Sequence, residues 1–276
     1  GDTMYIFGGK DSATAHARND LWWINLKTPR AWNQVTVQGT WPEARWGHTA
    51  VLAKDDRAQP VMVVYGGRKN ATELADDDVW VLTIPRYVNQ GGGGAATSFS
   101  WRGLELSSPE PGPLEGHSAV LVARGYLNPR THRMQVFGGR KANGDLTNYV
   151  WELRQVEVAD SSSVWTWFDP QLDNSDVAAR MRHAAVYDKE WTRMIVHGGD
   201  TTPTAAGGNL GDLWELDLEN ANWTEITITP TDSMPLARSG HTMVVDSRPI
   251  QVHVPEIYDP SSGASGTWTQ KPNGPK

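Results

Sequence analysis

The chain has 276 residues, of which 38% are hydrophobic and 21% charged, a composition typical of a soluble globular protein that buries a substantial core. Its formal net charge of −7 argues against nucleic acid as the main partner, because neutralising phosphates requires concentrated Lys and Arg. Cysteine is absent, which excludes disulfides, thiolate metal sites and Cys nucleophiles.

No apolar run is long enough to cross a membrane, so we expect no membrane insertion in the given chain. Because Gly1 begins in the middle of a repeated pattern, a signal peptide or anchor could precede the given sequence.

Short β-prone runs that end in a Gly-Gly pair recur along the chain. They cover residues 5–9, 63–67, 135–139 and 195–199 and are spaced by about 60 to 70 residues. Paired glycines fit a turn in which the backbone needs positive φ and approaches a neighbouring strand closely.

Each Gly-Gly run belongs to a set of four predicted strands. The strand after it carries Trp22, Trp80, Trp151 or Trp214, and the next carries Trp32, Trp101, Trp165 or Trp167, or Trp223. A further strand opens with His48, His117, His183 or His241. These runs alternate apolar and polar residues between Gly, Pro, Asn and Asp, which is typical of short strands, and no segment shows sustained helical spacing.

The predicted fold class is therefore all-β. A unit of four short antiparallel strands cannot cover both of its faces alone, so copies stack radially and form a β-propeller. The Trp side chains are expected to fill the wedges between these blades.

With these motifs the sequence resembles the kelch-repeat family over roughly the whole chain. The resemblance rests on Gly-Gly, the following Asp/Asn-Leu-Trp, the later Trp, and the segments 42–48 and 235–241. Two copies depart from the pattern: Leu114 replaces Arg before Gly116-His117, and Arg182 replaces Gly before His183. The resemblance implies a kelch-type β-propeller, similar to the central domain of galactose oxidase, with about five blades visible and five or six in the closed ring.

We expect a single propeller domain over 1–276 that is part of a larger protein. With strands lettered A to D from the inside outwards, blade 1 supplies strands B to D at 3–37, and further blades follow at 48–106, 117–169, 183–228 and, in part, 241–272. The first and last blades are incomplete. Either residues are missing near Arg248-Ile250, or the chain is an excised portion of a larger propeller.

Strand alternation places the segment before each His and the segment after each Gly-Gly on one face, the loop face. Cations gather there on an otherwise acidic protein, and Arg presents a planar fork to carboxylates. The predicted partner-binding residues are Lys10, Arg45, Trp46, Arg68, Lys69, Arg140, Lys141, Arg182, Asp200 and Arg238. Glu115 and Arg180 belong to the same face.

Comparison between blades separates structural candidates from functional ones. Arg45 and Arg238 occupy one repeat position, which favours a role in holding loops together. The Arg-Lys pairs 68–69 and 140–141 follow the glycines in two blades only and are better candidates for binding.

The repeated histidines suggest a metal site, but their spacing argues against one. Zinc requires ligand nitrogens at about 2 Å, whereas equivalent positions on adjacent sheets lie on the order of 10 Å apart. We therefore expect no metal and assign hydrogen-bonding roles to His48, His117, His183 and His241. Trp41, Trp46 and Trp191 remain as loop candidates for stacking on a sugar.

Other segments carry weaker signals. A solvated turn explains Asp76-Asp77-Asp78, and residues 88–95 are typical of a flexible tether because they lack the Lys-Ser/Thr of a phosphate loop. We find no Gly-x-Ser-x-Gly and no His-Glu-x-x-His motif.

The predicted function is a non-catalytic scaffold that holds a protein or peptide partner through the loop face. A more specific version of this hypothesis is that the partner is acidic. No cofactor is expected, because the copper radical oxidases similar to galactose oxidase need a Cys crosslinked to a Tyr. A carbohydrate-binding or carbohydrate-active propeller at the cell surface is the alternative. An extracellular or cell-surface location is slightly favoured over a cytoplasmic one.

Overall fold

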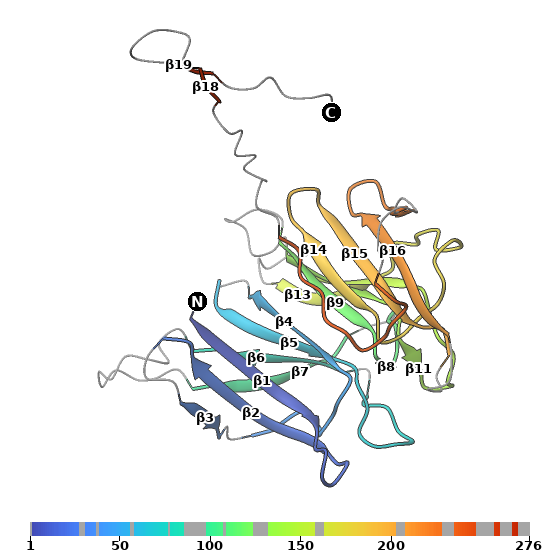
Figure 1. Ribbon diagram of the computed structural model, residues 1–276. Helices are drawn as coiled ribbons and strands as arrows, with labels where there is room; N and C mark the ends of the chain where they lie inside the picture. The colour runs from blue at the N-terminus through green and yellow to red at the C-terminus, as the bar shows by residue number, and fades with distance from the viewer. Residues whose placement is uncertain are drawn as a thin grey trace. The chain divides into compact units, whose positions relative to one another are not determined.

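The computed structural model describes residues 2–27, 31–36, 39–55, 58–76, 78–85, 98–106, 109–123, 132–157, 163–202, 208–227, 235–246, 257–259 and 267–269. The predicted all-β fold class is confirmed, since every regular element in these ranges is a β-strand (Figure 1). None of these ranges contains a helix long and apolar enough to cross a membrane. The predicted tether at 88–95 and the junction near Arg248-Ile250 lie outside the described residues.

Four antiparallel sheets of consecutive strands correspond to blades. Blade 1 is β1 (Thr3–Lys10), β2 (Ala17–Asn25) and β3 (Trp32–Val35), and blade 2 is β4 (Thr49–Lys54), β5 (Pro60–Tyr65), β6 (Val79–Thr83) and β7 (Ser100–Leu104). Blade 3 is β9 (Ser118–Ala123), β10 (His132–Phe137), β12 (Val150–Glu157) and β13 (Ser163–Phe168). Blade 4 is β14 (Ala184–Asp188), β15 (Arg193–Asp200), β16 (Asn209–Asp217) and β17 (Asn222–Glu225).

Two smaller sheets complete the described strands. The short strands β8 (Leu114–Glu115) and β11 (Arg140–Lys141) pair with each other. The chain divides into two compact units, 1–245 and 246–276, and the second contains the pair β18 (Ile257–Asp259) and β19 (Thr267–Thr269). Residues 241–244, which the sequence predicts to be a strand, form none, because no described residue pairs with them in a ladder.

The cores lie between successive blades, because strand alternation turns every second side chain toward one neighbour. In blade 2, Val64 and Trp80 are paired across β5 and β6 and pack with Phe7 and Leu21 of blade 1. Val63, on the opposite face, packs in a second cluster that includes residues of blade 3. Full burial of one such side chain contributes roughly 1.5–3 kcal/mol, so these interfaces hold the blades together.

The Gly-Gly pairs and the repeated histidines form one recurring contact between blades. Gly138 has φ +67°, and a Cβ there would lie 2.7 Å from the carbonyl oxygen of Arg180 and 2.9 Å from the ring of His183. That ring packs on Phe137 with centroids 5.1 Å apart, and its Nε2 lies 2.8 Å from the hydroxyl of Ser118. A side chain at the glycine would therefore displace the histidine.

The same contact recurs at the other blade interfaces. His48 packs on Phe7 and His117 on Tyr65, while Thr49 lies within hydrogen-bonding distance of His117. Burial lowers the pKa of His48 to about 4, and the pKa values of His117 and His183 to about 3. The histidines are therefore neutral hydrogen-bonding groups at physiological pH.

Candidate partner-binding site

Backbone hydrogen bonds join the loop before each His to the loop after a Gly-Gly pair. Trp46 and Arg68 exchange two such bonds, of 3.0 and 2.8 Å, and Met181 and Asp200 exchange two of the same lengths. Each of these pairs joins the loop that leads into a blade to the loop after the Gly-Gly pair of the same blade, and the Glu115–Arg68 ion pair connects two blades.

The residues directly before the histidines are themselves joined in a chain. Gly116 donates to the carbonyl of Gly47 at 3.0 Å, Arg182 donates to Gly116 at 2.7 Å, and Gly240 donates to Arg182 at 2.7 Å. All four have positive φ, and Arg182, at φ +55°, is the one non-glycine among them. A left-handed conformation costs a residue with a side chain on the order of 1 kcal/mol. The surrounding hydrogen bonds must therefore offset this cost at Arg182.

A pocket of about 200 Å³ opens beside this chain of residues, and we call it the central pocket. Its lining comes from the loops of blades 2, 3 and 4: Trp46, Gly47, Arg68, Glu115, Gly116, Arg140, Met181 and Arg182. The volume suits a single side chain better than a drug-sized ligand, for which pockets start near roughly 300 Å³.

Arginines outnumber carboxylates around the central pocket. Glu115 accepts a hydrogen bond from Arg68 at 2.9 Å and also pairs with Arg140. Arg182 donates to Asp200 through Nε at 2.7 Å. Both carboxylate side chains are only 6% exposed, whereas Arg182 is 40% exposed, so the net positive charge faces the opening.

Arg68 and Arg140 differ in how many of their N–H groups already have hydrogen-bonding partners within the protein. Arg68 donates to the carbonyls of Asn70 and Ala71 as well as to Glu115, which fixes its orientation. Among the described residues, Arg140 has Glu115 as its hydrogen-bonding partner. Arg140 therefore keeps N–H groups available for a ligand carboxylate.

Trp46 forms the aromatic wall of the central pocket. The ammonium of Lys10 lies 5.3 Å from the centroid of its ring, and the guanidinium of Arg68 lies 5.7 Å from it. Both distances fall within the range of cation–π attraction. Lys10, Trp46 and Arg68 thus form a stack that extends the cationic region toward blade 1.

Arg45 is placed away from the opening. It is 1% exposed and donates to the carbonyls of Gly66 and Glu43, each at 3.1 Å. Burial lowers the pKa of its guanidinium, although nearby carboxylates offset part of this effect. This position supports the loop-holding role.

Three further predicted residues do not line the central pocket. Lys69 lies among the carboxylates of Glu43 and Asp76. Lys141 lies 5.1 Å from the centroid of the Tyr149 ring, and the exposed Arg238 donates to the carbonyl of Leu236. None of the three belongs to the lining of the central pocket.

The repeats also contain two positions, those of Arg180 and Asp212, whose residues change together between blades. Arg180, which is fully buried, donates to both oxygens of Asp212 at 2.7 Å each. Burial would raise the pKa of Asp212, but Arg180 holds it below its ordinary value. Blade 3 has Leu114 and Tyr149 at these two repeat positions, so the cation and the anion are replaced together.

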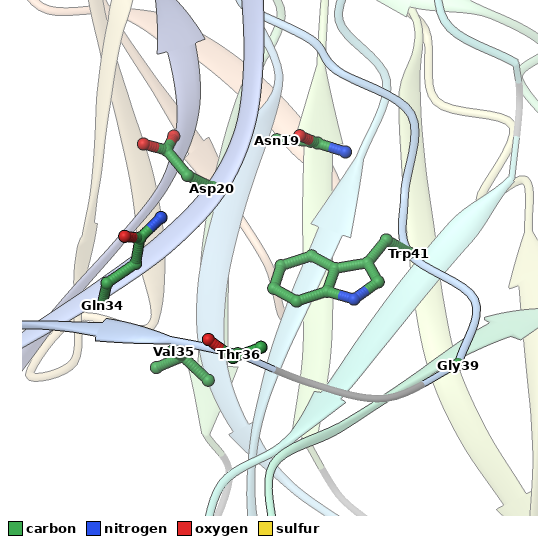
Figure 2. A pocket seen from close by; sticks show the side chains of 7 residues that line it. All are labelled: Asn19, Asp20, Gln34, Val35, Thr36, Gly39 and Trp41. Carbon is green, nitrogen blue, oxygen red and sulfur yellow. The ribbon is translucent and has the colours of Figure 1, made fainter.

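A second pocket, the rim pocket, lies between β2, β3 and the loop that leads to blade 2 (Figure 2). Its volume is about 450 Å³, and it is lined by Asn19, Asp20, Gln34, Val35, Thr36, Gly39 and Trp41. Among these, Trp41 is the one residue that the sequence predicts as a candidate for ligand contact.

Comparison with known proteins gives consistent matches. The model of the KLHDC2/KLHL20/DRC7 Kelch-repeats domain matches residues 1–252. Tip elongation aberrant protein 3 of Schizosaccharomyces pombe is 26% identical over 251 residues, which cover 81% of this chain and 19% of that protein. Host cell factor 2 of Homo sapiens is 26% identical over 257 residues, which cover 88% of this chain and 28% of that protein. The chain therefore spans less than a third of the length of these two relatives.

Among solved structures, the cryo-EM structure of RAG in complex with one melted RSS and one unmelted RSS matches with a TM-score of 0.48. The identity is 13%, over 81% of this chain and 67% of that chain.

Proposed function

Because the chain belongs to the kelch-repeat family, we propose that it is a non-catalytic binding scaffold whose central pocket holds a carboxylate of a protein or peptide partner. The kelch-repeat fold supports this proposal, since binding loops on a rigid scaffold are a common place for function.

The observation that carries the proposal is the convergence of Arg68, Arg140 and Arg182 from three blades on one pocket. Guanidinium groups match a carboxylate in shape and charge, and hydrogen bonds between charged groups are roughly twice as strong as neutral ones. Arg140 and Arg182 are the proposed contacts: Glu115, which is also bonded to Arg68, orients Arg140, and Asp200 orients Arg182.

The proposal is tested with two labelled peptides, an octamer of Glu and an octamer of Gln, titrated by fluorescence anisotropy. We expect the Glu peptide to bind more tightly, and Arg140→Gln to weaken its binding about tenfold, because a charged hydrogen bond contributes roughly 1.5–3 kcal/mol. Arg102→Gln, which removes an exposed arginine from β7, is the matched control and should leave binding unchanged. Equal binding of both peptides would overturn the proposal.

The alternative, a carbohydrate partner, makes a different prediction for the same variants. A glycan array probed with the wild-type chain and with Arg140→Gln would then give a hit that survives the substitution. Loss of peptide binding without any glycan hit supports the carboxylate site instead.

A further inference from the structure

A pair of histidines joins blade 4 to residues 235–245, which we call the 235–245 segment. Nδ1 of His197 in β15 lies 3.0 Å from Nε2 of His241, within hydrogen-bonding distance. The two rings meet edge to face, with centroids 5.0 Å apart, and both side chains are partly buried. Two groups that titrate near physiological pH therefore share one contact.

The first of these histidines occupies a repeat position that is aromatic in the other three blades. The residue before each Gly-Gly pair packs on the histidine that opens the next repeat: Phe7, Tyr65 and Phe137 in blades 1 to 3, and His197 in blade 4. An imidazole thus replaces a ring that has no charge at physiological pH. The contact gains a second titratable group that the other described blade contacts lack.

A second repeat position differs together with the first. Nε2 of His183 lies 2.8 Å from the hydroxyl of Ser118, which is the residue after the preceding strand-opening histidine. Blade 4 has Ala184 at the position of Ser118, so this position offers no hydroxyl to His241. Nδ1 of His197 supplies the partner instead. The two differences together replace a histidine–hydroxyl pair by a histidine–histidine pair.

The geometry of the pair conflicts with an added proton. A singly charged pair carries three protons on its four ring nitrogens. If both facing nitrogens are protonated, the hydrogen bond is lost; if the bond remains, Nδ1 of His241 must carry a proton. That nitrogen is buried, and no described residue is hydrogen-bonded to it. Either form is costly, so the closed contact disfavours protonation.

The surrounding charges give the added proton little compensation. The charged and titratable groups that face the pair are Arg180, His183, Asp212 and Arg238. Burial is the main cause that lowers the pKa of both histidines of the pair, and Arg238 lowers both further. Asp212 opposes this effect at His197, but it is already bonded to Arg180. His183 is neutral, because its own pKa is lowered to about 3.

The 235–245 segment is otherwise attached to blade 4 through its backbone. Arg238 donates to the carbonyl of Leu210 at 3.0 Å and accepts from Gly199 at 2.8 Å. Gly240 donates to the carbonyl of Arg182 at 2.7 Å, so the segment also contacts a residue of the central pocket. The described residues of the segment form no strand ladder. Opening of this segment alone therefore costs less free energy than unfolding of the blades.

We propose that His197 and His241 form a pH-sensitive latch, which holds the 235–245 segment on blade 4 while both rings are neutral and releases it when they are protonated. In the open segment both rings are exposed to water and become protonated below about pH 6.5. The open form then binds more protons than the closed form, so the free energy of opening falls as the pH falls. The latch does not rest on the proposed function.

Hydrogen exchange followed by mass spectrometry tests the latch in the wild-type chain. Protection of the 235–245 segment is compared at pH 7.5 and pH 5.5, after correction for the intrinsic exchange rate. Each titrating histidine lowers the protection up to about tenfold over this range, so the pair lowers it up to about a hundredfold. We expect a loss of more than tenfold. A loss of tenfold or less would overturn the proposal.

The matched control gives this contact the residues of blade 3. The double variant His197→Phe, Ala184→Ser keeps His241 and restores an aromatic ring and a hydroxyl beside it. Its loss of protection should be no more than about tenfold, because one titrating group remains. Equal losses in the wild type and the double variant would show that the pair has no part in the pH dependence. Thermal unfolding at pH 7.5 checks that the double variant folds.

An NMR titration of the imidazole nitrogens needs no variant and decides the question if the double variant does not fold. We expect His197 and His241 of the wild-type chain each to titrate below pH 6.5. Titration of both at or above pH 6.5 would mean that the closed contact favours the charged rings, which contradicts a latch that acid opens.

Discussion

Gly138 shows at the scale of single residues why glycine pairs recur in this chain. Its φ of +67° is unfavourable for other residues, and the ring of His183 occupies the space where a Cβ would project. The next glycine, Gly139, meets the backbone side of His117 in the same way. The pairs 66–67, 138–139 and 198–199 are thus each packed between two histidines, whereas Gly9 of the first pair has no atom within 4 Å of its Cβ position.

We expect Gly138→Ala to lower the free energy of unfolding by more than about 2 kcal/mol, because the Cβ adds a steric clash to backbone strain. Gly144→Ala is the control, since Gly144 has φ +92° but no atom near its Cβ position, and should cost about 1 kcal/mol. Urea denaturation of both variants measures the difference. Equal losses would show that the contact with His183 is unimportant.

The buried histidines make stability depend on pH. In the unfolded chain they become protonated below about pH 6.5, whereas burial keeps His48 neutral down to about pH 4 and His117 and His183 down to about pH 3. Between these limits the unfolded state binds more protons, so the free energy of unfolding must fall as the pH falls. Each histidine contributes up to roughly 1.4 kcal/mol per pH unit.

Urea denaturation from pH 7.5 to pH 4.5 measures this slope. His183→Gln removes one of the titrating groups and should make the curve less steep below pH 6.5, even if the variant is less stable overall. An unchanged slope in the variant would contradict the role assigned to His183.

At the scale of structural elements, the ion pair between Arg180 and Asp212 explains why two repeat positions change together between blades 3 and 4. In blade 4, Arg180 from the loop before β14 donates to Asp212 of β16 and to the carbonyl of Gly198 of β15, so it connects two strands to one loop. Blade 3 replaces this pair by Leu114 and Tyr149. Leu114 is buried and Tyr149 is 54% exposed, so neither position of blade 3 leaves an unpaired charge in the interior, where a single charge is costly.

Transfer of the blade 3 pair into blade 4 tests this explanation. Arg180→Leu and Asp212→Tyr should each lower the free energy of unfolding by about 3 kcal/mol, because each leaves the other charge unpaired. The double variant should recover at least about 2 kcal/mol relative to the sum of the single losses. Additive losses in the double-mutant cycle would show that the two positions are independent.

The strands could be predicted from sequence because alternation and Gly-Gly spacing act locally, and the four-stranded sheets of blades 2 to 4 follow from them. Residues 241–244 could not, since a strand also needs a neighbour to pair with. The ion pairs between side chains could not be predicted from the sequence either. Lys69 pairs with Glu43 and Asp76, and Glu115 pairs with two arginines of different blades.

At the scale of the whole molecule, the repeats bring distant segments together at one pocket. Arg68, Arg140 and Arg182 are separated in sequence but share the lining of the central pocket. Strand alternation predicts the loop face, but which cations line the pocket depends on local hydrogen bonds that alternation does not specify. Arg182 illustrates this, because its direction follows from a positive φ and from Asp200.

The central claim is that Arg140 and Arg182 hold the same carboxylate, and a double-mutant cycle of binding tests it most directly. Affinity for the Glu octamer is measured for the wild type, Arg140→Gln, Arg182→Gln and the double variant, with Arg140→Gln plus Arg102→Gln as the control pair. We predict that the losses for the first pair are non-additive by at least about 1 kcal/mol, and that the losses for the control pair add. Additive losses for Arg140 and Arg182, or affinity that neither substitution changes, would contradict the account.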